Sequence, residues 1–184
     1  YQKVISSEVA CHEGWSYVTV NIENVFLQGM TYEEISDLIG EAEHIVHFTL
    51  PPGSGAILRR IPGFEDFNER YEVLRCTKPG TGTKDAPRVF SLGLRSITQD
   101  DECQLVATMF DPELEMRHED GRLVGLQAKH VDDIKIGAGP WLAELIIKKL
   151  ESVFGKLAIT RNTFTKCGIH NTLLPDGSVK MDQD

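Results

Sequence analysis

The sequence lacks long hydrophobic runs, closely spaced cysteine pairs and any excess of positive charge. No apolar stretch approaches the roughly 18 residues that a membrane span requires, so no membrane partner is expected. None of the 4 cysteines belongs to a Cys-x-x-Cys pair, which favours isolated reduced thiols in an intracellular protein. Zinc is a minor alternative that would need Cys11, His12, Cys167 and His170 to come together. The net charge of -9 excludes a generally basic, DNA-coating surface, so any contact with nucleic acid must use a local basic patch.

The first residues also lack the features of a natural start. They contain no Met, and no charged segment precedes an apolar block as in a signal peptide, so we expect a piece of a longer chain. The 184 residues predict one domain or most of one, and an apolar content of 41% is sufficient for a core.

Two adjacent carboxylates, Asp132 and Asp133, lie between apolar extended segments at residues 123–131 and 134–136. This pattern predicts a β-hairpin with both acids at its tip, because Asp side chains suit turns. One interpretation is an ordinary solvated turn. The other is a magnesium site, since hard carboxylate oxygens are the ligands that magnesium prefers. The second interpretation requires another carboxylate from elsewhere in the chain.

The remaining sequence predicts a mixture of helices and strands, placed by apolar periodicity, capping residues and turn signals. Helices are expected at residues 2–13, 31–39, 86–97 and 139–154. Strands are expected at residues 16–22, 45–50, 56–61, 72–76, 105–110, 113–117, 157–160 and 163–167, in addition to the hairpin. A Gly-rich loop occupies residues 78–85, and the tail after residue 170 has the pattern of an incomplete hairpin.

The order of these elements indicates an α+β fold. It is strand, inserted strand-rich segment, helix, two strands, helix, strand, which is a βαββαβ, ferredoxin-like unit with an insertion after its first strand. In such a unit the first strand lies beside the central hairpin. The end of the first strand, at Asn21, should therefore face the tip that carries Asp132 and Asp133.

Five motifs in the same order resemble the reverse transcriptase of copia-type retrotransposons. The family's first motif, Asp-hydrophobic-x-x-Ala-Phe-Leu-x-Gly, is similar to residues 21–29, Asn-Ile-Glu-Asn-Val-Phe-Leu-Gln-Gly. Its Pro-Gly-Phe element corresponds to residues 62–64, and its Lys-Pro-x-Tyr-Gly-Leu-Lys-Gln-Ala-Pro-Arg-Ala-(Trp/Phe) motif to residues 78–90. The Tyr-Val-Asp-Asp box is similar to residues 130–133, and the Phe-Leu-Gly-Ile element to residues 164–169. These matches extend over nearly the whole chain.

The resemblance implies an RNA-directed DNA polymerase domain. It implies a palm formed by residues 1–29 and 78–170, a fingers-like insertion at residues 30–77, and the start of a following region at residues 171–184. The partners that it implies are an RNA or DNA template-primer, deoxynucleotide triphosphates, and the rest of the polyprotein, with an integrase upstream and an RNase H downstream. The expected location is a cytoplasmic particle or the nucleus.

The resemblance also implies nucleotidyl transfer with two magnesium ions, for which Asp132 and Asp133 are the metal ligands. The third catalytic position, an Asp in the family, is Asn21 here. At ~4 Å and an effective dielectric of ~20, a lost charge pair costs about 4 kcal/mol. A deficit of that size slows the step roughly a thousandfold. We therefore expect impaired catalysis; the alternatives are a non-catalytic, degenerate palm with at most weak nucleic-acid binding and, more remotely, a metal-dependent nuclease.

Six further positions acquire roles from the resemblance. Ile22, Phe26 and Lys84 are expected at the nucleotide, and Arg88, Phe164 and Gly168 at the template-primer. The simpler interpretation is core packing for Phe26 and for the segment that carries Phe164 and Gly168, and solvated charge for Lys84 and Arg88. Departures from the family pattern at Thr81, Thr83 and His130 agree with a decayed copy.

Overall fold

The computed structural model describes residues 2–23, 28–80 and 82–183. Its centre is a six-stranded sheet of strand order β4-β5-β6-β7-β1-β8, in which every neighbouring pair is antiparallel. The strands are β1 (Ser16–Asn21), β4 (Val106–Ala107), β5 (Leu114–Glu119), β6 (Arg122–His130), β7 (Asp133–Ala138) and β8 (Ala158–Arg161). The expected α+β class is confirmed, and β1 pairs with the β6–β7 hairpin as expected.

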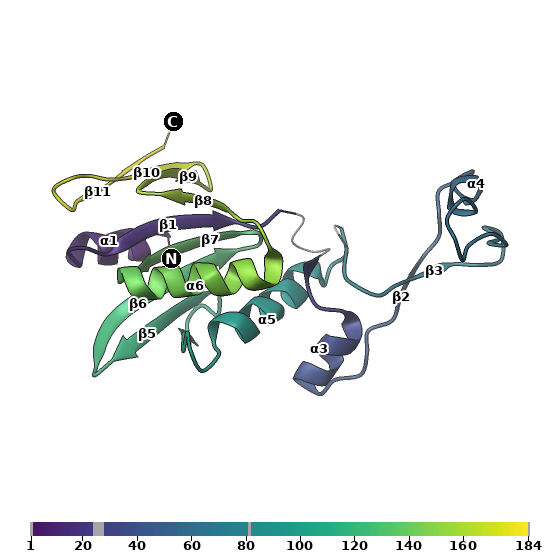
Figure 1. Cartoon of the computed structure of the whole chain (residues 1–184), viewed down its shortest axis with the longest axis horizontal. Coiled ribbons are helices and arrows are strands. Elements are labelled where there is room, and N and C mark those ends of the chain that lie inside the picture. The colour runs from purple at the N-terminus through teal and green to yellow at the C-terminus, as the bar shows by residue number, and fades with distance from the viewer. Residues whose placement is uncertain (1, 24–27, 81, 184) are drawn as a thin grey trace.

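Two helices cover one face of this sheet (Figure 1). They are α5 (Ala86–Thr98) and α6 (Pro140–Phe154), and both carry Pro in the first turn, where its missing N–H costs no hydrogen bond. Their apolar sides pack on Val18 and Val20 of β1 and on Ile134 and Ile136 of β7, all at most 1% exposed. The β-branched residues of each strand alternate with polar ones, so period-two patterning determines which side of the sheet becomes the main core.

The opposite face is covered by helix α1 (Gln2–Cys11) and by a small three-stranded sheet. This sheet consists of β9 (Thr163–Lys166), β10 (Ile169–Leu173) and β11 (Val179–Asp182). A Cβ atom on Gly137 would lie 2.6 Å from Val9 of α1, so the glycine permits this close approach. The tail was expected to form an incomplete hairpin, but β10 and β11 pair fully because the chain reverses at Gly177, with φ of 83°.

The insertion after β1 projects from the body of the molecule as an arm (Figure 1). It contains α3 (Tyr32–Ile39), β2 (Val46–Phe48), α4 (Gly55–Leu58) and β3 (Leu74–Cys76), and β2 pairs with β3. The expected capping box at Thr31 and Glu34 is present. The expected strand at residues 56–61 is wrong: local hydrogen bonds from Ile57 and Leu58 to Ser54 form a helical turn. A short apolar run does not distinguish a strand from such a turn.

The expected strand at residues 105–110 is also mostly wrong, since only Val106 and Ala107 pair with β5. The Thr108 hydroxyl and the Asp111 backbone bond to each other and turn the chain before Pro112. Within the described ranges, no helix is both long enough and apolar enough to cross a membrane.

Replacement of Ile146 by Ala should lower the free energy of unfolding by about 3 kcal/mol, because Ile146 is 0% exposed between α6 and the sheet. Val153→Ala on the same helix is the matched control, since Val153 is 55% exposed, and it should cost less than about 1 kcal/mol. Urea denaturation measures both values. Equal losses would contradict the packing of α6 described above.

Candidate functional site

The C-terminal end of β1 and the tip of the β6–β7 hairpin come together in the middle of the sheet, where these strands end. Asn21 is the register partner of Asp133, and the backbone N–H of Ile22 donates to the carbonyl of Asp132 over 3.0 Å. The hairpin reverses at Val131 and Asp132, between the paired residues His130 and Asp133. The structure therefore brings together Asn21, Asp132 and Asp133, the three residues that the sequence indicated for catalysis.

The backbone at the tip is strained. Val131 has a φ of 55°, in the left-handed region that β-branched residues rarely adopt. Strain of this kind costs of order 1–3 kcal/mol and persists where the surrounding structure imposes it. Here the pairing of β6 with β7 and the bond from Ile22 to Asp132 impose the turn and fix the two acids relative to β1.

One oxygen of Asp133 already has two partners within the protein. The Thr19 hydroxyl of β1 donates to Asp133 Oδ1 over 2.8 Å, and Lys166 Nζ lies 3.3 Å from the same oxygen. Lys166 also donates to the backbone carbonyl of Asp133 over 2.7 Å. Lys166 is 1% exposed; burial lowers its pKa below the usual value, and the charge of Asp133 opposes that shift.

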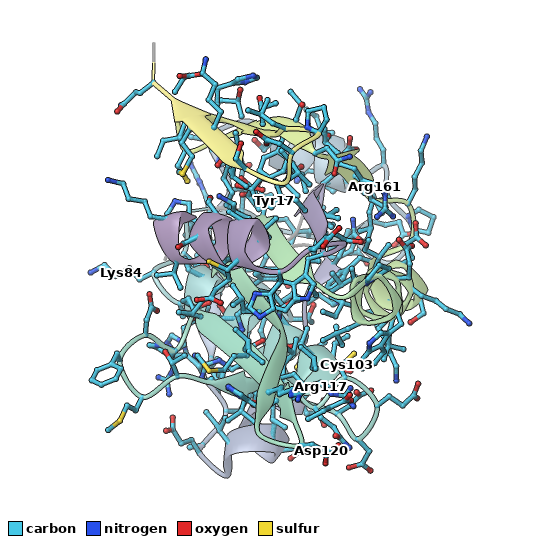
Figure 2. The ribbon with its side chains drawn as sticks, turned by 90° about the vertical axis from the view of Figure 1, so that its left-hand side faces the viewer. Tyr17, Lys84, Cys103, Arg117, Asp120 and Arg161 are labelled. Carbon is cyan, nitrogen blue, oxygen red and sulfur yellow. The ribbon has the colours of Figure 1, made fainter. Side chains whose placement is uncertain are left out.

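A buried polar network continues from this point across the same face of the sheet. Lys135 Nζ donates to Ser6 Oγ and to Asn171 Oδ1, each over 2.9 Å, and Tyr17 donates to the same Asn171 oxygen over 2.8 Å. Burial lowers the pKa of Lys135 to about 8, and the nearby charge of Lys166 adds to this shift. Figure 2 shows Tyr17 between α1 and the C-terminal strands, as these contacts require.

The other expected site residues differ in their exposure to solvent. Phe26 lies outside the described residues. Phe164 is 5% exposed and its ring centroid lies 4.8 Å from that of Tyr17, which favours the core-packing interpretation. Gly168 is exposed in the turn between β9 and β10, and Lys84 projects from the loop before α5 (Figure 2).

Arg88 lies next to the hairpin, although it does not contact the two acids. A cavity of about 580 Å³ separates α5 from the tip, and its lining includes Arg88, Arg95, Lys129, His130 and Val131. Arg88 is exposed at the mouth of the cavity and lies 3.7 Å from Glu41 of the insertion. The lining also includes Glu113, which lies 3.4 Å from Arg95, and Lys129 is buried in an ion pair with Glu115.

The donor set at the tip does not fit a pair of magnesium ions. It offers the carboxylates of Asp132 and Asp133 and the neutral amide of Asn21, with the ammonium of Lys166 beside them. In the part of the chain that the structure describes, no three His, Cys, Asp or Glu side chains are grouped so that they could hold a metal. The zinc alternative from the sequence therefore has no support among the described residues.

Sequence reasoning missed Thr19, Lys135 and Lys166. Thr19 and Lys135 alternate with buried apolar residues of β1 and β7, and that pattern ordinarily indicates a solvated face. Lys166 shares a face of β9 with the buried Phe164, but a lysine is rarely buried in a core. They are buried only because α1 and the β9–β11 sheet cover this face, which alternation within one strand does not reveal.

Comparison with known proteins identified no relative: no family model, no curated protein and no solved structure matches the chain.

The Tyr17 hydroxyl should remain protonated at about pH 11, because burial raises its pKa from 10.0 to about 12. The folded chain and its Tyr17→Phe variant should then show nearly equal phenolate absorbance at that pH. In denaturant, where Tyr17 is solvated, the variant should show one phenolate fewer. A full phenolate difference in the folded state would contradict the burial of Tyr17 in this network.

Proposed function

We propose that the chain is the palm of a copia-type reverse transcriptase, an RNA-directed DNA polymerase domain whose catalysis is impaired at Asn21. The observation that carries the proposal is the pairing of Asn21 with Asp133 at the hairpin tip. The order of β1, α5, β6, β7, α6 and β8, with β1 between β7 and β8, supports the palm interpretation. On this proposal residues 1–29 and 78–170 are palm, and residues 30–77 form a fingers-like insertion.

The proposed reaction is attack of a primer 3′-hydroxyl, which loses its proton, on the α-phosphate of a deoxynucleotide triphosphate; the bond to the β-phosphate breaks and pyrophosphate leaves. Such phosphoryl transfer depends on positioning and on neutralisation of charge, which magnesium ions supply in enzymes of this class. The protein's own contribution is to hold carboxylates at fixed positions. Thr19 orients Asp133 from β1, and the bond from Ile22 holds Asp132, but Asn21 contributes no charge.

The proposed template-primer contact lies beside α5. The chain is acidic overall, and the exposed Arg88 next to this cavity is the basic side chain proposed to contact phosphates. Arg88 borders this cavity, and Lys84 projects from the preceding loop. The remaining polyprotein regions, integrase and RNase H, are partners on the same proposal.

A second candidate function is a non-catalytic palm that binds nucleic acid weakly. The neutral side chain of Asn21 and the ammonium of Lys166 beside Asp133 favour this candidate, because both reduce the negative charge that metal-dependent transfer requires. The two candidates share the fold and differ in activity.

Asn21→Asp should restore primer extension. Both forms are tested as the palm of a copia-type enzyme, in place of that enzyme's own palm. On an RNA template we expect the Asn21→Asp form to extend the primer at least about 100-fold faster than the unchanged chain. Asn68→Asp, in the exposed arm, adds the same charge far from the tip and should leave the rate unchanged. Equal rates for the unchanged chain and the Asn21→Asp variant would refute the assignment of Asn21 to the catalytic position.

A further inference from the structure

Exposed apolar side chains follow one outer edge of the six-stranded sheet. Edge strand β4 and the loop after it carry Val106, Met109 and Phe110, which are 65%, 90% and 92% exposed. Single apolar residues are common on protein surfaces, but a contiguous apolar patch marks an interaction site more often. The proposed function assigns no role to these three residues.

The three side chains border a groove of about 640 Å³. Leu114 and Met116 of β5 also line this groove, and they pack against the core on the α1 side of the sheet. Among the described residues, the lining comes only from positions 104–118. Helix α1 lies over β6 and β7, so this part of the sheet face stays open at the groove.

The backbone of β4 is open to a partner as well. In the sheet order β4 is terminal, so β5 pairs with only one side of it. The N–H of Thr108 donates to the Leu114 carbonyl of β5, and backbone groups alternate in direction along a strand. The N–H and C=O of Ala107 therefore point away from β5. An extended segment can bond to these groups while its side chains enter the groove.

Most of the negative charge of the chain lies around this groove. Residues 100–122 include eight acidic and two basic residues, a net charge of -6 out of -9 for the whole chain. Five of these acids form ion pairs within the protein. Among the described residues no ion pair engages the other three, which are Asp101, Asp111 and Asp120.

The three acids without ion pairs lie at or near the groove. Asp111 lines it, and the Asp101 carbonyl accepts a hydrogen bond from the side chain of Gln104, another lining residue. Asp120 lies at the turn of the β5–β6 hairpin, shortly after the lining residue His118 (Figure 2). Their charge repels the phosphates of nucleic acid and an equally acidic second copy of this chain, whereas it attracts lysine and arginine.

We infer that the groove beside β4 binds an extended segment of another protein, in which apolar side chains alternate with lysine or arginine. The apolar side chains enter the groove beside Met109 and Phe110, and the basic ones face the acids that surround it. The inference goes beyond the proposed function and does not rest on it, because it uses no residue of the hairpin tip.

The test is fluorescence anisotropy of a short labelled peptide of alternating lysine and valine, mixed with the full chain. The peptide should bind, and its affinity should fall as salt is added, because ions screen the attraction between exposed charges. Two control peptides should each bind at least about tenfold more weakly. One alternates glutamate with valine and reverses the charge, and the other alternates lysine with serine and lacks the apolar side chains.

Matched variants of the chain locate the binding surface. Phe110→Ser should weaken binding of the lysine–valine peptide at least about fivefold, whereas Tyr71→Ser, which removes an 82% exposed aromatic side chain from the arm, should not change it. The pair Asp101→Asn and Asp120→Asn should weaken binding about threefold or more. The pair Glu65→Gln and Asp66→Asn removes the same charge from the arm and should have no effect. Circular dichroism verifies the fold of each variant.

Equal affinity for the lysine–valine and glutamate–valine peptides would overturn the inference, and so would unchanged affinity in folded Phe110→Ser. Sedimentation velocity tests the second copy as occupant: self-association of the unchanged chain that Phe110→Ser abolishes would assign the groove to it and overturn the inference. Weaker binding of a labelled single-stranded RNA by Phe110→Ser would assign the groove to nucleic acid, with the same consequence.

Discussion

The antiparallel pairing of β1 with β7 is the contact on which the rest of the molecule depends. It joins the first strand of the sheet to a hairpin more than a hundred residues later, across six consecutive register pairs. Through this pairing the apolar residues of both strands face α5 and α6, and the polar ones face α1 and β9–β11. Because the side-chain period of a strand is two, a shift of one residue would reverse this division and move Asn21 away from Asp133.

Buried charged side chains tie the hairpin to other strands on both faces of the sheet. On the helix side, Glu115 of β5 is 0% exposed and accepts hydrogen bonds from Lys129, Gln127 and Thr98. On the opposite face, Lys166 is held by Asp133. Such pairs contribute little net stability, but removal of one partner is strongly destabilising because a buried charge remains alone. Both pairs connect a hairpin strand to a neighbouring strand, so they fix the tip that carries the two acids.

The parts of the fold that were predictable from the sequence are those with a long periodic signal. The helix at residues 139–154, the helix at residues 31–39 and the hairpin around Asp132 were predicted and are observed, and so is the approach of Asn21 to the tip. The errors fall on short segments, such as residues 56–61, whose local hydrogen bonds compete with strand pairing. The ammonium at Asp133 could not be predicted, because it arrives from β9 through tertiary packing.

The tip can be understood as a balance between charge and stability. Three carboxylates a few ångström apart repel one another unless cations lie between them, since each like-charge pair at ~4 Å costs about 4 kcal/mol at an effective dielectric of ~20. Relative to the three carboxylates that the proposed function implies, Asn21 lacks one such charge, and Lys166 offsets another from inside the protein. On the proposed function, selection for metal-dependent activity would oppose both changes, whereas stability alone favours them, as is general for functional sites. A chain no longer under selection for catalysis would therefore keep its fold, and its first changes would be those that reduce the repulsion between carboxylates at the tip. On the proposed function, the neutral amide, the paired carboxylate and the intact strained turn at this tip agree with such a history.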